Sequence, residues 1–235
     1  MISIITINFN NAQGLSKTLN SLAEQSNQNY EWILIDGKSS DGSVEEAKLF
    51  ARRQDILVSE KDLGIYNAMN KGIVKATGDC IIFLNSGDLF FDHSAVQSIA
   101  HHWRQNLDLL LFGFIVRGRP RMPKPLWWRF WSLPTSHQAI VYNSELLRLN
   151  PFDERYLSAA DYEHFLRVNQ QNIEVKSIPL ILIINEPYGC DQNLHQVLNE
   201  YAQALISQGV PSLFVKIMIA IKKKYLGIVL GEAKP

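Results

Sequence analysis

Four acidic residues stand at places where regular elements are predicted to begin or end, and carboxylates at such places can do chemistry. Asp36 closes a short apolar run, Asp62 precedes a glycine that opens a helical pattern, and Asp161 opens a later one. Asp88 ends the turn Phe83-Leu84-Asn85-Ser86-Gly87-Asp88, which follows a second apolar run. A turn of this kind can hold a divalent cation, and with it a diphosphate, through oxygen ligands. The placement of these acids favours one shared site over unrelated surface carboxylates.

The elements that must position these acids are predicted from the hydrophobic pattern. Up to about residue 84, short β-branched runs alternate with apolar residues at helical spacing. Strands are predicted at 2–8, 32–35, 56–58 and 81–84, and helices at 15–22, 44–51 and 65–73. Strands that alternate with helices indicate an α/β fold with a mostly parallel central sheet flanked by helices. Ligands bind such sheets at the carboxyl ends of the strands, where Asn8, Asp36 and the 85–88 turn would lie.

The second half of the chain has a looser pattern. Helices are predicted at 95–103 and 194–207, and strands at 109–116, 173–178 and 180–184. A basic, proline-rich loop at 117–125 precedes Trp127, Trp128 and Trp131. These tryptophans are too closely spaced for one face of a helix, so they either stack on a sugar or lipid from a loop or form an aromatic cluster on a β-region.

The C-terminal segment is predicted to form an amphipathic, basic helix. Lys216, Lys222 and Lys223 face away from its apolar arc, and Lys224 lies at the edge. The arc consists of Leu213, Phe214, Ile217, Met218, Ile221, Tyr225 and Ile228. Such a helix can lie on an anionic membrane surface, or it can dock on its own domain or on a second subunit. We expect residues 1–208 to form one domain, with halves at 1–93 and 94–208, and residues 209–235 to form a tail.

Composition excludes several classes of function. The chain of 235 residues suits one large domain, and its 23 Lys and Arg balance its 23 Asp and Glu, so no global positive charge favours nucleic acid. The apolar run after Met1 is too short for a signal peptide or a membrane span, and Cys80 and Cys190 lack the spacing of a metal site. We therefore expect a cytoplasmic protein with reduced thiols. Residues 8–14 contain neither a dinucleotide-binding nor a P-loop glycine pattern.

Four segments, in this order along the chain, closely resemble the motifs of the inverting family 2 glycosyltransferases. They are Thr6-Ile7-Asn8, Asp36-Gly37-Lys38-Ser39-Ser40-Asp41-Gly42-Ser43, Asp62-Leu63-Gly64-Ile65-Tyr66-Asn67-Ala68-Met69-Asn70-Lys71-Gly72 and Asn85-Ser86-Gly87-Asp88. More narrowly, roughly residues 1–190 are similar to the bacterial enzymes that build exopolysaccharide, O-antigen or colanic-acid repeat units. The resemblance implies the GT-A fold and transfer of a hexose-type sugar from a nucleotide-diphosphate donor, with UDP as the expected nucleotide. The expected acceptor is a lipid-linked glycan at the cytoplasmic membrane face.

The resemblance also implies roles on the donor side. Asp36 matches the acid that accepts hydrogen bonds from uracil or ribose, although a turn-forming role would suit the same position. Asp88 matches the turn that binds Mn²⁺ or Mg²⁺, but the acids usual at its first and third positions are replaced by Asn85 and Gly87. Lys71 either meets a phosphate or stays on a solvated face. The expected donor-binding residues are Thr6, Asn8, Asp36, Asp62, Asn70, Lys71, Asn85 and Ser86.

On the acceptor side, the segment 152–163 resembles the stretch whose helix-opening acid is the general base. Inversion needs a base that removes the proton of the acceptor hydroxyl as its oxygen attacks the anomeric carbon. We therefore expect Asp161 to be the base, with Glu163 as the second choice. His137 and Gln138 are expected to orient the acceptor or the diphosphate, with a purely structural histidine as the alternative.

Two other functions are compatible with the sequence. The altered metal turn would also suit a protein that binds a nucleotide sugar without turnover. A sugar nucleotidyltransferase would need a loop rich in glycine and lysine after the first strand, and residues 8–14 lack it. Among partners, the sequence leaves open a homo-oligomer and contact with an anionic membrane.

Overall fold

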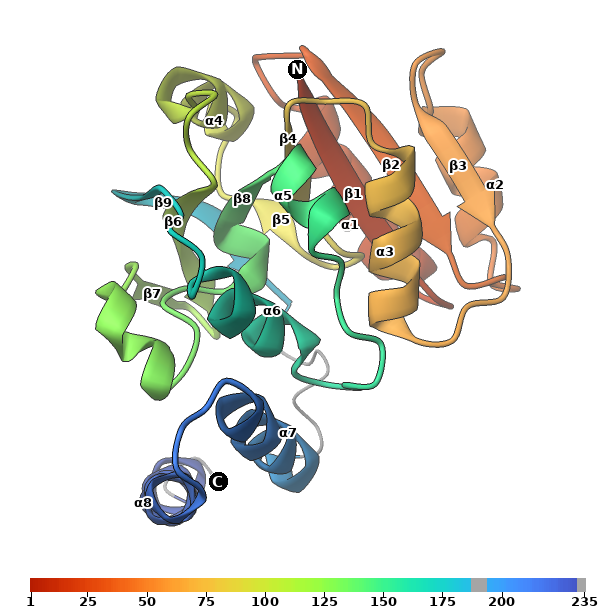
Figure 1. Cartoon of the computed structure of the whole chain (residues 1–235). Helices are drawn as coiled ribbons and strands as arrows, with labels where there is room; N and C mark the ends of the chain where they lie inside the picture. Colours follow the sequence, from red (N-terminus) through yellow and green to blue (C-terminus); the bar gives the residue numbers. More distant parts are fainter. Residues whose placement is uncertain (187–193, 232–235) are drawn as a thin grey trace.

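A central sheet carries helices on both faces, and a helical hairpin from the C-terminal part of the chain lies against one end (Figure 1). The structure is a computed structural model that describes residues 1–186 and 194–231. Cys80 is buried as a free thiol, whereas Cys190 lies outside the described residues. The α/β architecture agrees with the class expected from the sequence.

The first half of the chain forms the parallel part of the sheet. Its strands are β1 (Ile2–Asn8), β2 (Tyr30–Asp36), β3 (Ile56–Ser59) and β4 (Cys80–Phe83). The helices between them are α1 (Ala12–Ala23), α2 (Ser43–Phe50) and α3 (Ile65–Lys75). The strand order is β3-β2-β1-β4, and each neighbouring pair is parallel. All of these elements lie where the hydrophobic pattern predicts them.

The register of the parallel strands brings polar residues from distant parts of the chain together. Asn8 at the end of β1 is the neighbour of Asp36 at the end of β2, and Asp36 is the neighbour of Ser59 on β3. These carboxyl ends lie at one edge of the sheet, which is where ligands bind in folds of this kind.

The second half adds strands of both directions. They are β5 (Leu89–Phe90), β6 (Leu109–Val116), β7 (Arg119–Arg121), β8 (Ile140–Asn143) and β9 (Val175–Asn185). The helices are α4 (Ala95–His102), α5 (Ser144–Leu149), α6 (Ala160–Val168), α7 (Leu194–Ser207) and α8 (Ser212–Gly231), with short 3-10 helices η1 (Leu126–Phe130) and η2 (His137–Ala139). From β4 the sheet continues through β8, β6, β9 and β5, and β7 pairs with β6. β5, β8 and α5 were not expected from the sequence, and β7 lies in the segment 117–125 that was expected to be a loop.

The strands predicted at 173–178 and 180–184 are a single strand, β9. It runs parallel to β6, and its register is irregular between Leu111 and Gly113 of that strand. Pro179 lies within the irregular part, and proline has no N–H to donate to the ladder. The break in the sequence pattern therefore marks a bulge and not a turn between two strands.

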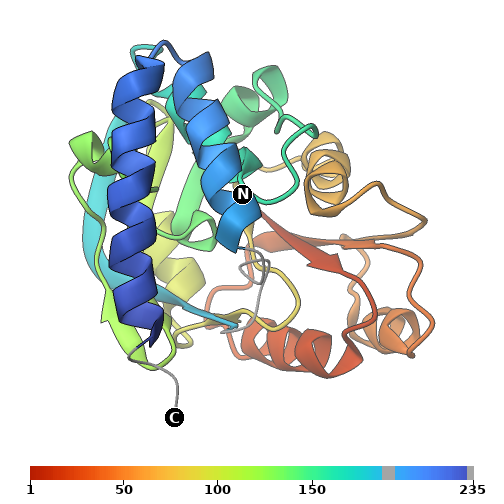
Figure 2. The same ribbon diagram turned by 90° about the horizontal axis from the view of Figure 1, so that it is seen from below.

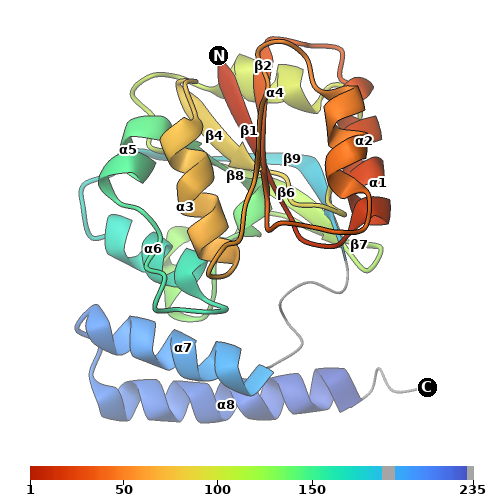
Figure 3. The same ribbon diagram turned by 90° about the vertical axis from the view of Figure 1, so that its right-hand side faces the viewer.

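Each face of the sheet has its own hydrophobic core. Side chains alternate along β1, so Ile5 and Ile7 belong to the core that contains α3 and α6, while Ile4 belongs to the core that contains α1. Figure 3 shows α3 and α6 on one side of the sheet and α1 and α2 on the other. Full burial of one isoleucine or leucine contributes about 1.5–3 kcal/mol. The strand ends are therefore anchored from both faces, which holds the polar residues at the sheet edge in place.

The helices α7 and α8 form a hairpin that packs against the α6 side of the molecule (Figures 2 and 3). Tyr201 of α7 stacks on Tyr162 of α6, with ring centroids 4.0 Å apart. Val215, Met218 and Ile219 of α8 join the same hydrophobic core. Within the described residues, none of the helices has both the length and the apolar character needed to cross a bilayer.

The docked face of α8 differs from the apolar arc that the sequence predicts. Of that arc, only Met218 is buried, and the side chain of Ile228 lies outside the described part. Lys222, predicted to face away, is buried instead, and its Nζ lies 4.0 Å from the centroid of the Tyr201 ring. The other arc residues are each more than half exposed: Leu213, Phe214, Ile217, Ile221 and Tyr225.

The clustered tryptophans lie in and next to the short helix η1, and not in an irregular loop or on a β-region. Trp127 and Trp128 pack edge to face with centroids 5.5 Å apart. Trp131 follows η1 and contacts Tyr225 of α8, with centroids 6.3 Å apart. The η1 segment therefore packs against α8.

Candidate active site

A hollow of about 410 Å³ opens at the carboxyl ends of the first strands. It is lined by Phe9, Gly37, Lys38, Lys61 and Asp62. Phe9 is 64% exposed although it is large and apolar, so its ring offers a face to a planar group. Gly37 lets these side chains come close to the backbone, because a Cβ there would lie 2.8 Å from the Asp62 carboxylate and 2.9 Å from the Phe9 ring. An aromatic face, two cations and an acid together suit a nucleotide.

Asp36 lies next to this hollow, and hydrogen bonds from within the protein surround its buried carboxylate. Oδ1 accepts from Asn8 Nδ2 (2.8 Å) and from the Ser39 hydroxyl. Oδ2 accepts from the Ser39 backbone N–H (2.9 Å) and the Ser59 hydroxyl (2.6 Å). Burial acts to raise the pKa of Asp36, but the hydrogen bonds from Ser39, Ser59 and Asn8 outweigh it and lower the pKa. A nucleotide that contacted this carboxylate would have to displace one of these bonds.

Thr6 and Asn70, both expected to bind the donor, are engaged elsewhere. Thr6 is fully buried, and its hydroxyl accepts a hydrogen bond from the Trp32 indole (2.9 Å). Asn70 bonds both the backbone N–H and the carbonyl of Phe152, at 3.0 and 2.9 Å. Thr6 therefore supports the core under β1, and Asn70 ties α3 to the second half of the chain, while a contact of either with the donor stays a prediction.

Lys71, expected either to meet a phosphate or to stay on a solvated face, is paired with an acid of the protein. Its Nζ forms an ion pair with Glu60 at 2.7 Å and donates to the carbonyl of Lys61 at 3.2 Å. The cations that line the hollow are Lys38 and Lys61. Lys71 therefore holds the chain at the end of β3, and Lys38 and Lys61 provide the positive charge in the hollow.

The turn that ends at Asp88 is joined to the nucleotide side by Ser86, whose hydroxyl donates to Asn8 Oδ1 (2.7 Å). Thr18 of α1 holds the turn by two bonds, donating to the Asp88 carbonyl (2.8 Å) and accepting from the Gly87 N–H (3.0 Å). Gly87 has a φ of +102°, which a residue with a Cβ adopts only under strain. Ser86 and Asn8 thus lie together, as the motifs predict.

Asp88 is a buried carboxylate surrounded by three donors. Gln138 Nε2 donates to Oδ2 (3.1 Å), while the Glu186 backbone N–H (2.9 Å) and Asn185 Nδ2 (3.3 Å) donate to Oδ1. Burial is the main cause that raises the pKa of Asp88 to about 6, and the neighbouring Glu186 carboxylate raises it further. The charged form is therefore less favourable than in water, and a bound cation would stabilise it.

The surroundings of Asp88 fit a divalent cation that is completed by substrate oxygens. Among residues 1–186 and 194–231, no group of three or more His, Cys, Asp and Glu side chains could hold a metal. Glu186 adds a second carboxylate beside the turn, since a Cβ on Gly87 would lie 2.9 Å from its Oε2. Asn85 Oδ1 and Asn185 Oδ1 are buried acceptors without a hydrogen-bond partner. Mg²⁺ and Mn²⁺ prefer oxygen ligands of these kinds and take others from phosphates.

Asp161 opens α6, as predicted, and is held by a residue of α3. The Tyr66 hydroxyl donates to Asp161 Oδ1 at 3.0 Å. Burial raises the pKa of Asp161, and the charge of His137 and the hydrogen bond from Tyr66 offset the rise only in part. A raised pKa makes a carboxylate a stronger base, which suits proton abstraction near neutral pH.

The short helix η2 connects the two carboxylates. His137 interacts electrostatically with Asp161, and Gln138 donates to Asp88. Adjacent residues of one element therefore reach the candidate base and the candidate cation site. His137 and Gln138 lie between these groups, where the motifs predict them.

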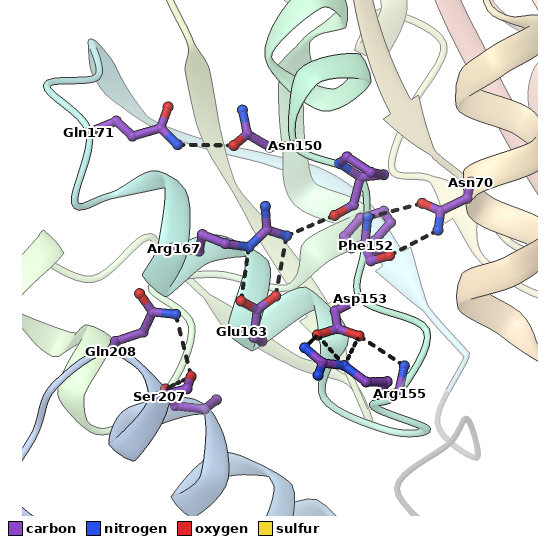
Figure 4. A network of polar contacts seen from close by, with 12 residues as sticks. Asn70, Asn150, Phe152, Asp153, Arg155, Glu163, Arg167, Gln171, Ser207 and Gln208 are labelled. Carbon is purple, nitrogen blue, oxygen red and sulfur yellow. Dashed lines mark hydrogen bonds and ion pairs between the residues drawn. The ribbon is translucent and has the colours of Figure 1, made fainter.

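Glu163, the second choice for the base, is committed to an ion pair. Its carboxylate is buried and accepts from Arg167 Nε at 2.9 Å. The same guanidinium donates to the carbonyl of Pro151 (Figure 4). Figure 4 also shows Asn70 reaching the backbone of Phe152. This network braces α6 and leaves Asp161 as the better base.

The loop that leads into α6 is fixed from two sides. From α7, the Glu200 carboxylate accepts from the backbone N–H groups of Leu157 (3.1 Å) and Ser158 (2.8 Å). From α3, Asn67 and Asn70 donate to the carboxylate of Glu154 at 3.0 and 2.9 Å. The start of α6, and with it Asp161, is positioned by both neighbouring helices.

Five residues of the site were not expected from the sequence. Phe9 and Tyr66 carry a usable signal, since one is an aromatic residue directly after the first strand and the other opens the helix after Asp62. Glu186 follows the last strand, at the edge where ligands bind. Lys38 and Lys61 have no distinguishing signal beyond their proximity to acidic motifs.

Solved structures of glycosyltransferases have the same architecture. TarS 1–349 of S. aureus in complex with UDP-GlcNAc matches with a TM-score of 0.66 at 18% identity, over 93% of this chain and 70% of that chain. Glucosyl-3-phosphoglycerate synthase from Mycobacterium tuberculosis, in complex with Mn²⁺, UDP and glucosyl-3-phosphoglycerate, matches with a TM-score of 0.63 at 15% identity, over 90% and 81%. At these identities the likeness shows the fold, which is the GT-A fold expected from the motifs.

Relatives in sequence are named as glycosyltransferases of PGL/p-HBAD and amylovoran biosynthesis. A PGL/p-HBAD biosynthesis glycosyltransferase of Mycobacterium tuberculosis is 30% identical over 180 residues, which are 71% of this chain and 69% of the relative. The amylovoran biosynthesis glycosyltransferase of Erwinia amylovora is 25% identical over 193 residues, 72% and 64% of the two chains. The family model described as glycosyl transferase family 2 matches residues 3–167. The chain therefore belongs to glycosyl transferase family 2 and is a glycosyltransferase.

Proposed function

We propose that the protein is a metal-dependent, inverting glycosyltransferase that moves a hexose from a UDP-linked donor to a lipid-linked glycan in bacterial surface polysaccharide synthesis. The main support for this proposal is the position of η2. Its residue His137 interacts with Asp161, whose pKa is raised, and its residue Gln138 donates to Asp88 in the turn beside the nucleotide hollow. A displacement at one carbon needs a base on one side and a site for the leaving diphosphate on the other.

The hollow is proposed to hold the nucleotide of the donor. The exposed ring of Phe9 stacks on the base, a contact that contributes about 1–3 kcal/mol in other nucleic-acid sites. Lys38 and Lys61 supply positive charge to the diphosphate, and Asp62 accepts hydrogen bonds from the base or ribose. The solved structures with UDP or UDP-GlcNAc support uracil as the base.

Asp88 and Glu186 are proposed to hold Mn²⁺ or Mg²⁺, together with the amide oxygen of Asn185. The bound ion neutralises charge on the departing diphosphate. Structures of glucosyl-3-phosphoglycerate synthase that contain Mn²⁺ or Mg²⁺ with UDP support this choice of metal. Gln138 keeps the Asp88 carboxylate oriented.

Asp161 is proposed to take the proton of the acceptor hydroxyl. As that oxygen forms its bond to the anomeric carbon, the bond from this carbon to the diphosphate oxygen breaks on the opposite face, and UDP leaves. The single displacement inverts the configuration of the carbon. Tyr66 holds the carboxylate in position during this step.

The acceptor is proposed to be lipid-linked, and the protein to work at the cytoplasmic membrane face with its C-terminal tail in peripheral contact. The names of the relatives, which concern amylovoran and PGL biosynthesis, support an acceptor of this class. The exposed apolar residues of α8 support contact with lipid.

A donor screen tests the proposed function. Release of free nucleotide is measured from UDP-linked and GDP-linked hexoses, with and without Mn²⁺ and with a polyprenyl-linked acceptor. We expect release from a UDP-sugar that depends on both the acceptor and Mn²⁺. Binding of UDP-sugars without release would favour a binding protein without turnover, and synthesis of UDP-sugar from UTP and a sugar phosphate would favour a nucleotidyltransferase.

Two substitutions distinguish a residue that contacts the nucleotide from a residue that only supports the nucleotide-binding hollow. Phe9→Ala is expected to weaken UDP binding by about 1–3 kcal/mol without lowering the melting temperature, because the ring is mostly exposed. Asp36→Ala is expected to lower both the UDP affinity and the melting temperature, because it removes the acceptor of the buried Asn8 amide and of the Ser39 backbone N–H, at about 1–3 kcal/mol for each donor that water cannot reach. Calorimetry with UDP and thermal unfolding are measured on the same samples. Parental affinity in Phe9→Ala would place the base elsewhere.

A further inference from the structure

An exposed apolar surface runs along α8 and continues onto η1. On η1, Trp127 is 64% exposed and Phe130 is 41% exposed. The two elements touch, since Trp131 packs on Tyr225 and its carbonyl accepts a hydrogen bond from Lys222 Nζ at 2.6 Å. On α8 the exposed residues are Leu213, Phe214, Ile217, Ile221 and Tyr225. Large apolar side chains exposed over neighbouring elements mark an interaction surface.

The surface is hollowed where α7 turns into α8. A hollow of about 440 Å³ lies there, lined by Phe130, Gln208, Gly209, Val210, Pro211 and Phe214. Most of these side chains are apolar, and none is charged. The hollow therefore has room for a hydrocarbon chain and no group that would hold an ionic ligand.

The two chain segments that form this surface contain basic residues and no acid. Residues 109–144 contain five Arg or Lys and no Asp or Glu, and residues 201–231 contain four Lys and no Asp or Glu. Because the whole chain has 23 residues of each sign, the acidic excess lies in the rest of the molecule. The exposed cations are Arg117, Arg119, Arg121 and Lys124 in and after the β6–β7 hairpin, and Lys216, Lys223 and Lys224 on α8.

These elements lie along one side of the molecule. In Figures 1 and 2 the β6–β7 hairpin, the green η1 helix and α8 are all at the left, and α2 is at the opposite side. We define the basic apolar face as the exposed arc of α8 together with Trp127 and Phe130 of η1 and Arg119 and Arg121 of β7.

We propose that the basic apolar face binds an anionic bilayer, with the apolar side chains of α8 and η1 at headgroup level and the cations on anionic lipids. Amphipathic basic helices lie in the interface in this way, and tryptophan prefers the same depth. Each Lys or Arg near an anionic surface adds about 1 kcal/mol. The proposal extends the proposed function and rests on it in one respect: the lipid-linked acceptor proposed above would lie in the bilayer that this face binds.

A second copy of the chain suits the face less well. In a two-fold dimer the same patch meets itself, so the basic patch that contains Lys216, Lys223 and Lys224 would face a second patch of the same charge. Neither segment of the face contains an acid to pair with them. An anionic bilayer complements both the charge and the apolar side chains.

Point variants test the face better than deletion of residues from Pro211 onward, because deletion would uncover the core that Val215 and Ile219 fill. Ile217→Asp places a charge in the exposed arc, and Leu49→Asp on α2 is the matched control, since Leu49 is 91% exposed on the opposite side. Co-sedimentation with phosphatidylglycerol and phosphatidylcholine vesicles is the measurement. We expect Ile217→Asp to bind roughly tenfold more weakly and Leu49→Asp to bind like the parent.

The basic part of the face is tested separately. The double substitution Arg119→Glu and Arg121→Glu is expected to lower binding by roughly tenfold or more and to weaken its dependence on salt. Both sets of variants are expected to keep the parental affinity for UDP and the parental turnover of a soluble acceptor analogue. Vesicle binding thus tests the bilayer proposal, while UDP affinity and turnover of the soluble analogue test the proposed function.

Equal co-sedimentation of the parent and Ile217→Asp would overturn the proposal. So would a parent that ignores the vesicles and sediments as a dimer in ultracentrifugation while Ile217→Asp sediments as a monomer. That second result would assign the face to a second copy of the chain.

Discussion

Replacing Asp161 with asparagine is expected to lower turnover by roughly 10²–10⁴-fold and to leave the affinity for UDP unchanged. Asparagine keeps the size of the side chain and can still accept the hydrogen bond from Tyr66, but it cannot take the proton of the acceptor. The melting temperature is not expected to fall, because burial already disfavours the charge of Asp161. Nucleotide release, UDP calorimetry and thermal unfolding on one preparation check all three statements.

Glu163→Gln is the matched control for this substitution. Glu163 lies on the same helix but pairs with Arg167, so its loss is expected to lower the melting temperature while turnover stays within a few-fold of the parent. Near-parental turnover in Asp161→Asn, together with a large loss in Glu163→Gln, would move the role of base to Glu163.

The pKa of Asp161 also sets the acid limb of the pH profile. Turnover needs the ionised carboxylate, so at saturating Mn²⁺ it is expected to fall as pH drops through this pKa. Because burial raises the pKa, the limb should lie above the usual range of aspartate. The residual activity of Asp161→Asn is expected to lack the limb.

Asp88→Asn is expected to abolish stimulation by Mn²⁺ and to stabilise the metal-free protein at neutral pH by about 1–3 kcal/mol. Burial raises the pKa of Asp88 from 3.8 to about 6. The protonated carboxyl therefore stabilises the folded state at pH values below the unfolded pKa, and this stabilisation is lost as pH rises through about 6. Asparagine stays neutral at every pH and so avoids the cost of a buried charge. A pKa shift of this size corresponds to about 3 kcal/mol of unfolding free energy at most. The gain should therefore appear near pH 7 and be small near pH 4.

Thermal unfolding from pH 4 to 8, in chelator and in Mn²⁺, checks this prediction. Mn²⁺ is expected to raise the melting temperature of the parent but not of Asp88→Asn. Asp92→Asn, an exposed carboxylate on the same segment, is the control and should behave like the parent. An equal rise in parent and Asp88→Asn would place the metal elsewhere.

Local patterns predicted the first half of the fold because each element there carries its own signal. The strand Ile2–Asn8 and the helix Ile65–Lys75 follow directly from β-branched runs and helical spacing. β8 could not be predicted in this way, since its four residues form a strand only by pairing with β4 on one side and β6 on the other. The motifs also led us to expect Asn8, Ser86, Asp88 and Asp161 in one site, but they could not predict that Ser86 bonds Asn8 or that His137 and Gln138 of η2 connect Asp161 with Asp88.

Side-chain direction and tertiary contacts account for what the sequence could not supply. Asp36 has the right position for a nucleotide ligand, yet its carboxylate is taken up by Ser39 and by Ser59 from another strand. On α8, the widest apolar arc is a good predictor of a helix but a poor predictor of its docked face. Packing against α7 buries the narrower face that contains Val215 and Lys222.

Transfer with inversion is tested most directly by the anomeric configuration of the product. The parent protein is incubated with Mn²⁺, an α-linked UDP-hexose and acceptor, and the coupling constant of the new anomeric proton is read by NMR. A single displacement assisted by Asp161 predicts a β-linked product. An α-linked product would contradict the account, because retention requires a different reaction path from the one that Asp161 and the Asp88 turn are proposed to support.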